Sequence, residues 1–211
     1  MFFHFIFFHT VYFLRLCAFL MRRPQHISLV GPWLLWSLRF KKSDFEARRL
    51  RLTGRFEGDE LNTLGTPLMV AHDLIKLAKL PDASILVDLG AGHGAFLVAG
   101  LLNGCAKVVG VDAHSDLTSG LRPLLPESTC ELISGDCREL LIPTGNLYIA
   151  AWTTWTPQTR AQIRQQLQFV PKGAKLWVWT HEMEEPEWAL RRVHRVQMPG
   201  YMIQVFLYEK V

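Results

Sequence analysis

The 211-residue sequence has few cysteines, and their spacing argues against two common cysteine-based structures. No two of them form a Cys-x-x-Cys pair, and no histidine lies at zinc-finger spacing from two of them, so we expect no metal site. Scattered thiols in a chain of this length do not suggest a disulfide framework either, and they are typical of a reducing compartment. The cysteines are Cys17, Cys105, Cys130 and Cys137.

Beyond residue 60 the sequence lacks an excess of positive charge. Residues 1–60 hold ten lysines and arginines against five acids, whereas residues 61–211 hold thirteen against fourteen. The excess behind the formal charge of +4 therefore lies in the N-terminal part of the chain. This layout suits an anionic membrane surface better than a groove that neutralises phosphates, so we do not expect nucleic acid as a partner.

The apolar N-terminus lacks the basic start and the Ala-x-Ala cleavage site of a secretory signal peptide. Phe2–Leu20 is almost continuously apolar and just long enough to span a bilayer as a helix, and Arg15 is close enough to the basic end to reach the interface. Ile27–Phe40 is too short to span and is typical of an interfacial segment. If the first run spans, Arg22 and Arg23 place the rest of the chain on the cytoplasmic side.

Translation from Met21 is an alternative that the sequence leaves open. The apolar run before that methionine would then be absent, and the protein would be cytoplasmic. The full chain predicts three parts: a membrane-associating extension (residues 1–45), a charged linker (46–65) and a folded domain (66–211).

Residues 66–211 contain no internal repeats and instead alternate short apolar strands with helices. Thr66 is expected to cap the first helix, with Pro67 as its first residue. Such alternation is typical of a parallel α/β sheet, and a closing hairpin around Pro199-Gly200 adds antiparallel edge strands. We expect strands at 84–89, 107–112, 130–133, 147–152, 175–180, 193–197 and 202–208, and later helices at 96–102 and 158–169.

A glycine-rich loop, Asp88–Gly94, follows the first of these strands. Glycines at alternate positions let the backbone turn sharply and approach a ligand closely, and free N–H groups at the next helix start face that ligand. Asp112 ends the second strand, 22 residues after Gly90, where its carboxylate can accept hydrogen bonds from both hydroxyls of a ribose. With Ala95 as the third small residue, the loop fits either a dinucleotide or S-adenosylmethionine (SAM).

Two acids favour SAM over a nicotinamide or flavin dinucleotide. Asp88 precedes the first glycine by two residues, where a negative charge would not help to bind a pyrophosphate. SAM carries a sulfonium and an amino group, which a carboxylate at that position can hold. Gly135-Asp136 follows the third strand, where an acid can accept a hydrogen bond from the exocyclic amine of an adenine.

These elements, in this order, resemble the class I SAM-dependent methyltransferases. Asp88–Gly94 resembles that family's motif I, Asp112 its ribose-binding acid and Gly135-Asp136 its adenine-binding acid. The resemblance covers roughly residues 66–211 and implies a Rossmann-like, seven-stranded, mostly parallel sheet with a C-terminal antiparallel hairpin. It also implies a set of residues that bind the cofactor: Asp88, Gly90, Ala91, Gly92, Gly94, Asp112 and Asp136.

The methyl acceptor is harder to predict. The segment after the fourth strand, Trp152–Pro157, has no Asn-Pro-Pro-Tyr-like motif, which argues against methylation of nucleic-acid bases. The apolar N-terminus and the loop are loosely similar to small membrane-anchored protein lysine methyltransferases, which implies transfer to a lysine nitrogen. A small or lipid-like acceptor, or a non-catalytic SAM-binding or membrane interaction protein, is the alternative.

Three residues of this segment are candidates for work at the acceptor: Trp152, Thr153 and Trp155. An apolar aromatic channel favours the neutral form of an amine, and aromatic faces attract methylated ammonium groups. The tryptophans could line such a channel, and the threonine could orient a proton. The alternative is that one or both tryptophans belong to the core.

Overall fold

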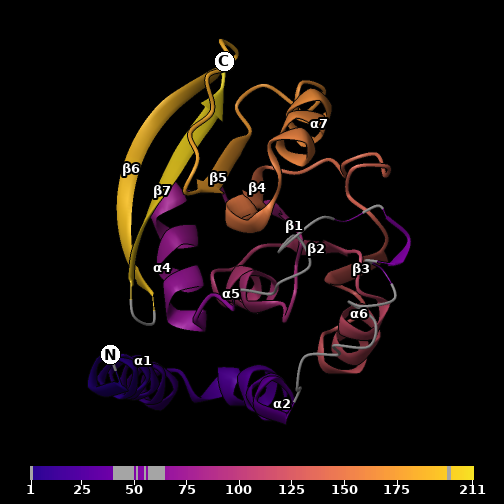
Figure 1. Ribbon diagram of the computed structural model, residues 1–211. Coiled ribbons are helices and arrows are strands. Elements are labelled where there is room, and N and C mark those ends of the chain that lie inside the picture. The colour runs from indigo at the N-terminus through magenta and orange to yellow at the C-terminus, as the bar shows by residue number, and fades with distance from the viewer. Residues whose placement is uncertain (1, 40–49, 51, 55, 57–64, 199–200) are drawn as a thin grey trace.

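The structure is a computed structural model that describes residues 2–39, 50, 52–54, 56, 65–198 and 201–211. Most of the predicted linker (46–65) and the Pro199-Gly200 turn lie outside the described residues. The fold of the remaining chain is an α/β sheet with helices on both faces (Figure 1).

The sheet has seven strands in the order β3-β2-β1-β4-β5-β7-β6. The first five strands of the chain run parallel, and β7 pairs antiparallel with both β5 and β6. This confirms the predicted class: a Rossmann-like, mostly parallel sheet that ends in an antiparallel hairpin. The strands are β1 (Ile85–Leu89), β2 (Lys107–Asp112), β3 (Cys130–Ser134), β4 (Leu147–Ala150), β5 (Lys175–Trp179), β6 (Trp188–Met198) and β7 (Tyr201–Lys210).

Helices α4, α5 and α6 cover one face of the sheet and α7 covers the other (Figure 1). The central strands are therefore buried on both faces, which explains their nearly continuous apolar sequences. The helices are α1 (Phe2–Arg22), α2 (Ile27–Arg39), α4 (Leu68–Ala78), α5 (Ala95–Leu102), α6 (Ser115–Leu121) and α7 (Pro157–Leu167).

Several predicted element boundaries differ from the structure; the sixth strand, for example, begins at Trp188 rather than at residue 193. Two others lie next to the candidate site. Thr66 is not the N-cap of α4, because Pro67 holds that position with extended backbone angles. The fourth strand ends at Ala150 rather than Trp152, and the chain then forms a short 3₁₀ turn, Trp152–Thr154. The earlier end of the fourth strand matters for the site. The candidate residues Trp152 and Thr153 lie in the 3₁₀ turn, and Trp155 follows it, so none of the three belongs to the sheet.

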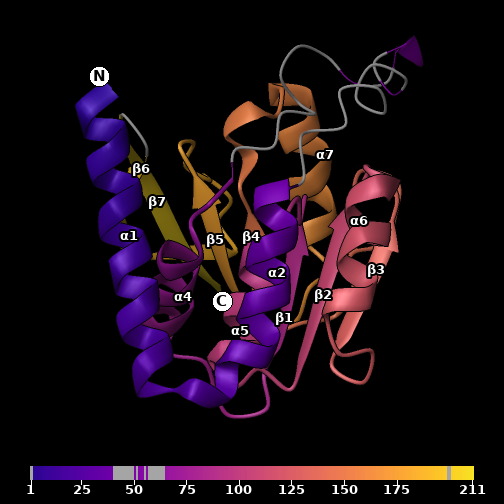
Figure 2. The ribbon, with the colours of Figure 1, turned by 90° about the horizontal axis from the view of Figure 1, so that it is seen from below.

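Helices α1 and α2 lie on the same side of the sheet as α4 and α5, and in Figure 2 α2 lies in front of the middle of the sheet. Leu16, Val30 and Trp33 are buried in the same apolar core as α4 and α5, and Arg15 forms an ion pair of 2.7 Å with Asp73. The segment predicted to be interfacial is thus a helix with one face on the α/β domain. Within the described residues, we find no helix with both the length and the apolar character that crossing a membrane requires.

Candidate functional site

The glycine loop joins β1 to α5 at the carboxyl edge of the sheet. Gly90 has a φ of +83° and Gly94 a φ of +74°, in the left-handed region that favours glycine. The backbone N–H groups of Gly90 and Ala91 donate to the Val111 carbonyl at 2.8 and 3.0 Å, which ties the loop to β2. A Cβ on Gly90 would lie 3.3 Å from the Trp155 ring, so the close approach of that ring also requires glycine.

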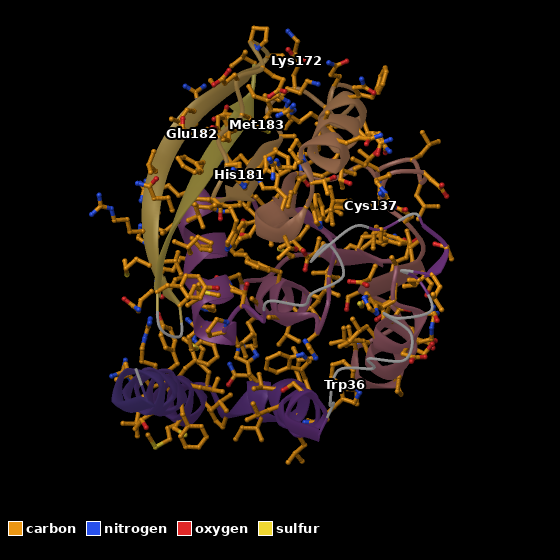
Figure 3. The ribbon with its side chains drawn as sticks, viewed as in Figure 1. Trp36, Cys137, Lys172, His181, Glu182 and Met183 are labelled. Atoms are coloured by element: carbon orange, nitrogen blue, oxygen red, sulfur yellow. The ribbon has the colours of Figure 1, made fainter. Side chains whose placement is uncertain are left out.

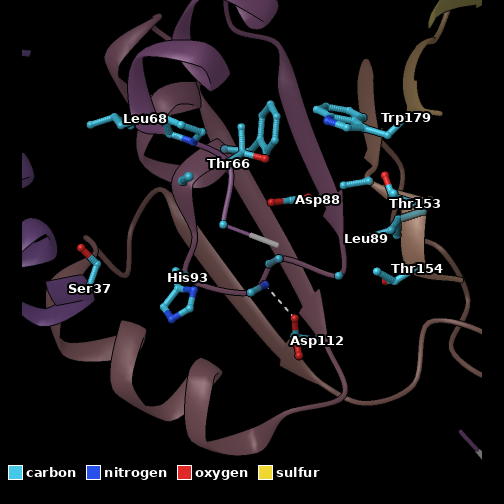
Figure 4. A pocket seen from close by; sticks show the side chains of 18 of the residues that line it. Ser37, Thr66, Leu68, Asp88, Leu89, His93, Asp112, Thr153, Thr154 and Trp179 are labelled. Carbon is cyan, nitrogen blue, oxygen red and sulfur yellow. Dashed lines mark hydrogen bonds between the residues drawn. The ribbon is translucent and has the colours of Figure 1, made fainter. Parts of the chain in front are cut away.

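Asp112, at the end of β2, holds this loop in place through a hydrogen bond. One carboxylate oxygen accepts from the Gly92 N–H at 2.7 Å and the other from the His114 N–H at 2.8 Å. Figure 4 shows the first of these bonds beside the cavity. The side chain is only 7% exposed, yet it lines the cavity. Asp112 therefore has a structural role in the loop besides the predicted role toward a ribose.

Asp88, at the end of β1, is buried with 2% of its surface exposed and lies against the cavity (Figure 4). No described residue makes a hydrogen bond or ion pair with its carboxylate. Burial, and next the nearby Asp112 carboxylate, raise the pKa of Asp88 from 3.8 to about 8. A positively charged ligand group beside this buried carboxylate would offset the free-energy cost of ionising it, so the site favours a cation.

Asp136, after β3, is already engaged by a neighbouring side chain. The Arg138 guanidinium forms an ion pair of 2.6 Å with it, and a second hydrogen bond of 2.9 Å makes the contact bidentate. The predicted adenine contact would therefore use the carboxylate's remaining acceptor capacity. Arg138 also donates to the Thr159 hydroxyl at 3.4 Å and lies over the Phe56 ring, so it closes this end of the site.

These residues line a cavity of about 820 Å³ that runs along the carboxyl edge of the sheet. Small-molecule sites commonly measure about 300–1,000 Å³, so the volume can hold a cofactor and part of a second molecule. The half at β1–β3, here the acidic half, contains Asp88, Asp112 and Asp136. The half at β4–β7, here the apolar half, is lined by Trp155, Trp179, Met198, Tyr201 and Ile203 and by Tyr12, Phe13 and Leu16 of α1.

The structure separates the three candidate residues after β4. Trp155 and Thr153 line the cavity, and the Thr153 hydroxyl lies 3.0 Å from that of Thr180. Trp152 is fully buried, is not among the residues that line the cavity, and donates to the His181 carbonyl at 3.2 Å. The interpretation of Trp152 as a channel residue is therefore wrong, because the 3₁₀ turn directs its ring into the core.

The predicted glycine positions also differ in their roles. Gly90, Ala91 and Gly92 line the cavity, whereas Gly94 does not. Gly94 instead begins α5 as its N-cap, and its left-handed backbone provides the turn into the helix. Gly94 is therefore the one predicted cofactor residue that does not line the cavity, and it contributes only to the shape of the loop.

The contact between α2 and the glycine loop was not predicted from the sequence. Trp33 Nε1 donates to the His93 carbonyl at 2.7 Å, and the Trp36 and His93 rings are 5.7 Å apart. Trp36 points from α2 toward α6 (Figure 3), where a Cβ on Gly120 would meet its Nε1 at 2.8 Å. Two tryptophans one helical turn apart were the available signal, but the sequence could not show what they pack against.

Comparisons of sequence identify no relatives: no protein-family model and no curated protein matches the chain. Solved structures do match in fold. TrmN from Thermus thermophilus superposes with a TM-score of 0.61 at 19% identity, over 72% of this chain and 52% of that one. The chain thus spans about half the length of the T. thermophilus protein.

Two further structures are matched over most of their length. An RNA methyltransferase from Salinibacter ruber, in complex with S-adenosyl-L-homocysteine, gives a TM-score of 0.56 at 23% identity, over 70% of this chain and 94% of that one. The N-methyltransferase NodS from Bradyrhizobium japonicum WM9 gives 0.56 at 11%, over 69% and 97%. The chain therefore has the fold that these methyltransferases share.

Proposed function

We propose that the protein is a SAM-dependent methyltransferase. The observation that carries this proposal is the Asp88 carboxylate, which is buried beside the glycine loop with a raised pKa and without a hydrogen bond from any described residue. The amino group and sulfonium of SAM are positive, so they would stabilise the ionised form of this acid. A dinucleotide would instead bring a negative pyrophosphate to the acidic half.

The residues present fit the rest of the cofactor. Asp88 and the backbone N–H groups of the glycine loop would hold the amino acid part, Asp112 the ribose and the Asp136 region the adenine. Bound SAM supplies a methyl group that is activated by its positive sulfur. The chain would exclude water from the transfer, since α2 covers the loop through the bond from Trp33 to the His93 carbonyl.

A lysine nitrogen, an RNA and a small or lipid-like molecule are candidate acceptors. The aromatic rings of Trp155 and Trp179 support the first, because such faces stabilise methylated ammonium groups. The names of fold neighbours such as the S. ruber RNA methyltransferase support the second. Against RNA, the acidic half of the cavity carries three carboxylates, and Asp136 neutralises the guanidinium of Arg138 there. Membrane attachment through residues 1–45 stays a prediction.

The proposal is tested by transfer of a labelled methyl group. The full chain is incubated with SAM carrying a radioactive methyl group and with cell-lysate fractions that contain protein, RNA, or lipid and small molecules. We expect label in one fraction and much less with the Asp112→Ala variant. SAM binding without transfer to any fraction would instead indicate a non-catalytic SAM-binding protein.

A further inference from the structure

The apolar half of the cavity is enclosed by parts of the chain that lie far apart in sequence. Met198 is the last residue of β6, Tyr201 is the first of β7, and Phe13 lies on α1. Figure 1 shows α1 beside this end of the hairpin. Phe13 is 57% exposed while it lines the cavity, so it marks a mouth between the cavity and solvent.

The lining of the apolar half carries aromatic, aliphatic and hydroxyl side chains. Among the described residues that line it, none has a charged side chain. A charged ligand would lose its hydration there without gaining an opposite charge, which is costly. The lining therefore selects an uncharged, mainly apolar ligand.

One polar atom in this half lacks a partner. Trp179 is 2% exposed and lines the cavity, and no described atom accepts the hydrogen of its Nε1. Its ring packs edge-to-face on Phe96 with the centroids 5.3 Å apart. Because Nε1 itself has almost no accessible surface, a ligand in the cavity would meet the apolar edge of this ring and not the N–H donor.

The lining also restricts the nucleophile. A hydroxyl acceptor would need a base to remove its proton before transfer, and the described lining of this half has no carboxylate, imidazole or amine. A neutral nitrogen needs no such base before the transfer, because its lone pair is already available. That lone pair would form the new N–C bond as the C–S bond of the sulfonium breaks and sulfur keeps the electron pair. The proton then leaves the product nitrogen to water at the mouth.

We propose that the apolar half binds an uncharged, mainly apolar small molecule that carries a neutral nitrogen. This inference rests on the proposed function, since it places the methyl acceptor beside SAM. It assigns the acidic half to the cofactor and the apolar half, with its mouth at Phe13, to the acceptor.

The test uses Prodan, an uncharged naphthalene dye whose emission moves to shorter wavelength in apolar surroundings. It is titrated into the full chain with S-adenosyl-L-homocysteine (SAH) present. We expect one saturable site, at least tenfold weaker in Phe13→Glu and unchanged in Leu14→Glu. Leu14 is the matched control, because it is 60% exposed on α1 and is not among the residues that line the cavity.

The outcomes separate this inference from the proposed function. If SAH binds but Prodan does not saturate, or if Phe13→Glu and Leu14→Glu weaken it equally, the inference is wrong and the proposed function stands. Displacement of Prodan by poly-L-lysine or by tRNA would overturn the inference in favour of a lysine or an RNA acceptor. If SAH does not bind at all, the proposed function fails and this inference fails with it.

Discussion

The two halves of the cavity are built from opposite kinds of side chain. The acidic half takes its carboxylates from the ends of three adjacent strands, β1, β2 and β3. The apolar half takes its side chains from the segment after β4, from β5, β6 and β7, and from α1. The difference indicates that the first half recognises a polar molecule with positive charge and the second an apolar one, which is what transfer between two bound molecules requires.

The largest expected effect in the acidic half comes from Asp112→Ala. The change removes a ribose acceptor and also the bonds to the Gly92 and His114 N–H groups, so the loop loses its support. Hydrogen bonds to a charged group contribute about 1.5–3 kcal/mol each, so SAH affinity should fall at least about 100-fold. Calorimetric titration measures this, with Asp82→Ala, at an exposed position, as the control. Unchanged affinity would refute the assignment of Asp112.

Asp88→Asn should separate stability from binding. Because the pKa of Asp88 is raised from 3.8 to about 8 in the folded protein, its contribution to stability is full below pH 3.8 and is lost as the pH rises toward 8. Between these two pH values the parent loses at most about 1.36 kcal/mol of folding stability per pH unit through this group. The Asn variant cannot ionise, so it should unfold at a higher temperature than the parent at pH 7. Its SAH affinity should fall at least tenfold.

The same residue predicts a proton release on binding. The positive amino group of SAH should lower the pKa of Asp88, so the parent protein should release a proton at pH 7 and the Asn variant should not. Calorimetry in buffers of different ionisation enthalpy measures this release. Equal release by both proteins would show that another group titrates.

A smaller effect is expected where the N-terminal helices meet the acidic half. Trp33→Phe keeps most of the packing of α2 but removes the hydrogen bond to the His93 carbonyl, which is worth about 1 kcal/mol. SAH affinity should fall about two- to fivefold. Leu35→Ala, an exposed position on the same helix, should have no effect on affinity. If both variants bind like the parent, α2 does not support the loop.

The acidic half was largely predictable from the sequence and the apolar half was not. Asp88, the glycines and Asp112 belong to one strand–loop–helix–strand unit, so their spacing fixes their relative positions. The bidentate contact of Arg138 with Asp136 depends on side-chain conformation, which spacing does not show. Trp155 was found, but Trp152 was assigned to the channel because the 3₁₀ turn after β4 has no periodicity to reveal it.

The remaining side chains of the apolar half come from segments near opposite ends of the sequence. Phe13 and Tyr201 meet the same cavity although one lies on α1 and the other on β7. The apolar pattern of the N-terminal extension indicated helices with an apolar face, but such a face can pack equally well against lipid or against protein. The structure places one face of these helices on the domain, and the buried side chains of Leu16, Val30 and Trp33 show where.

Comparative calorimetry decides whether the acidic half binds the SAM family of ligands or a dinucleotide. The full chain is titrated with SAH and, separately, with NAD under the same conditions. We expect saturable binding of SAH at one site per chain and no saturable binding of NAD at micromolar concentration. Saturable NAD binding without SAH binding would contradict this expectation, because Asp88 would then lie beside a pyrophosphate.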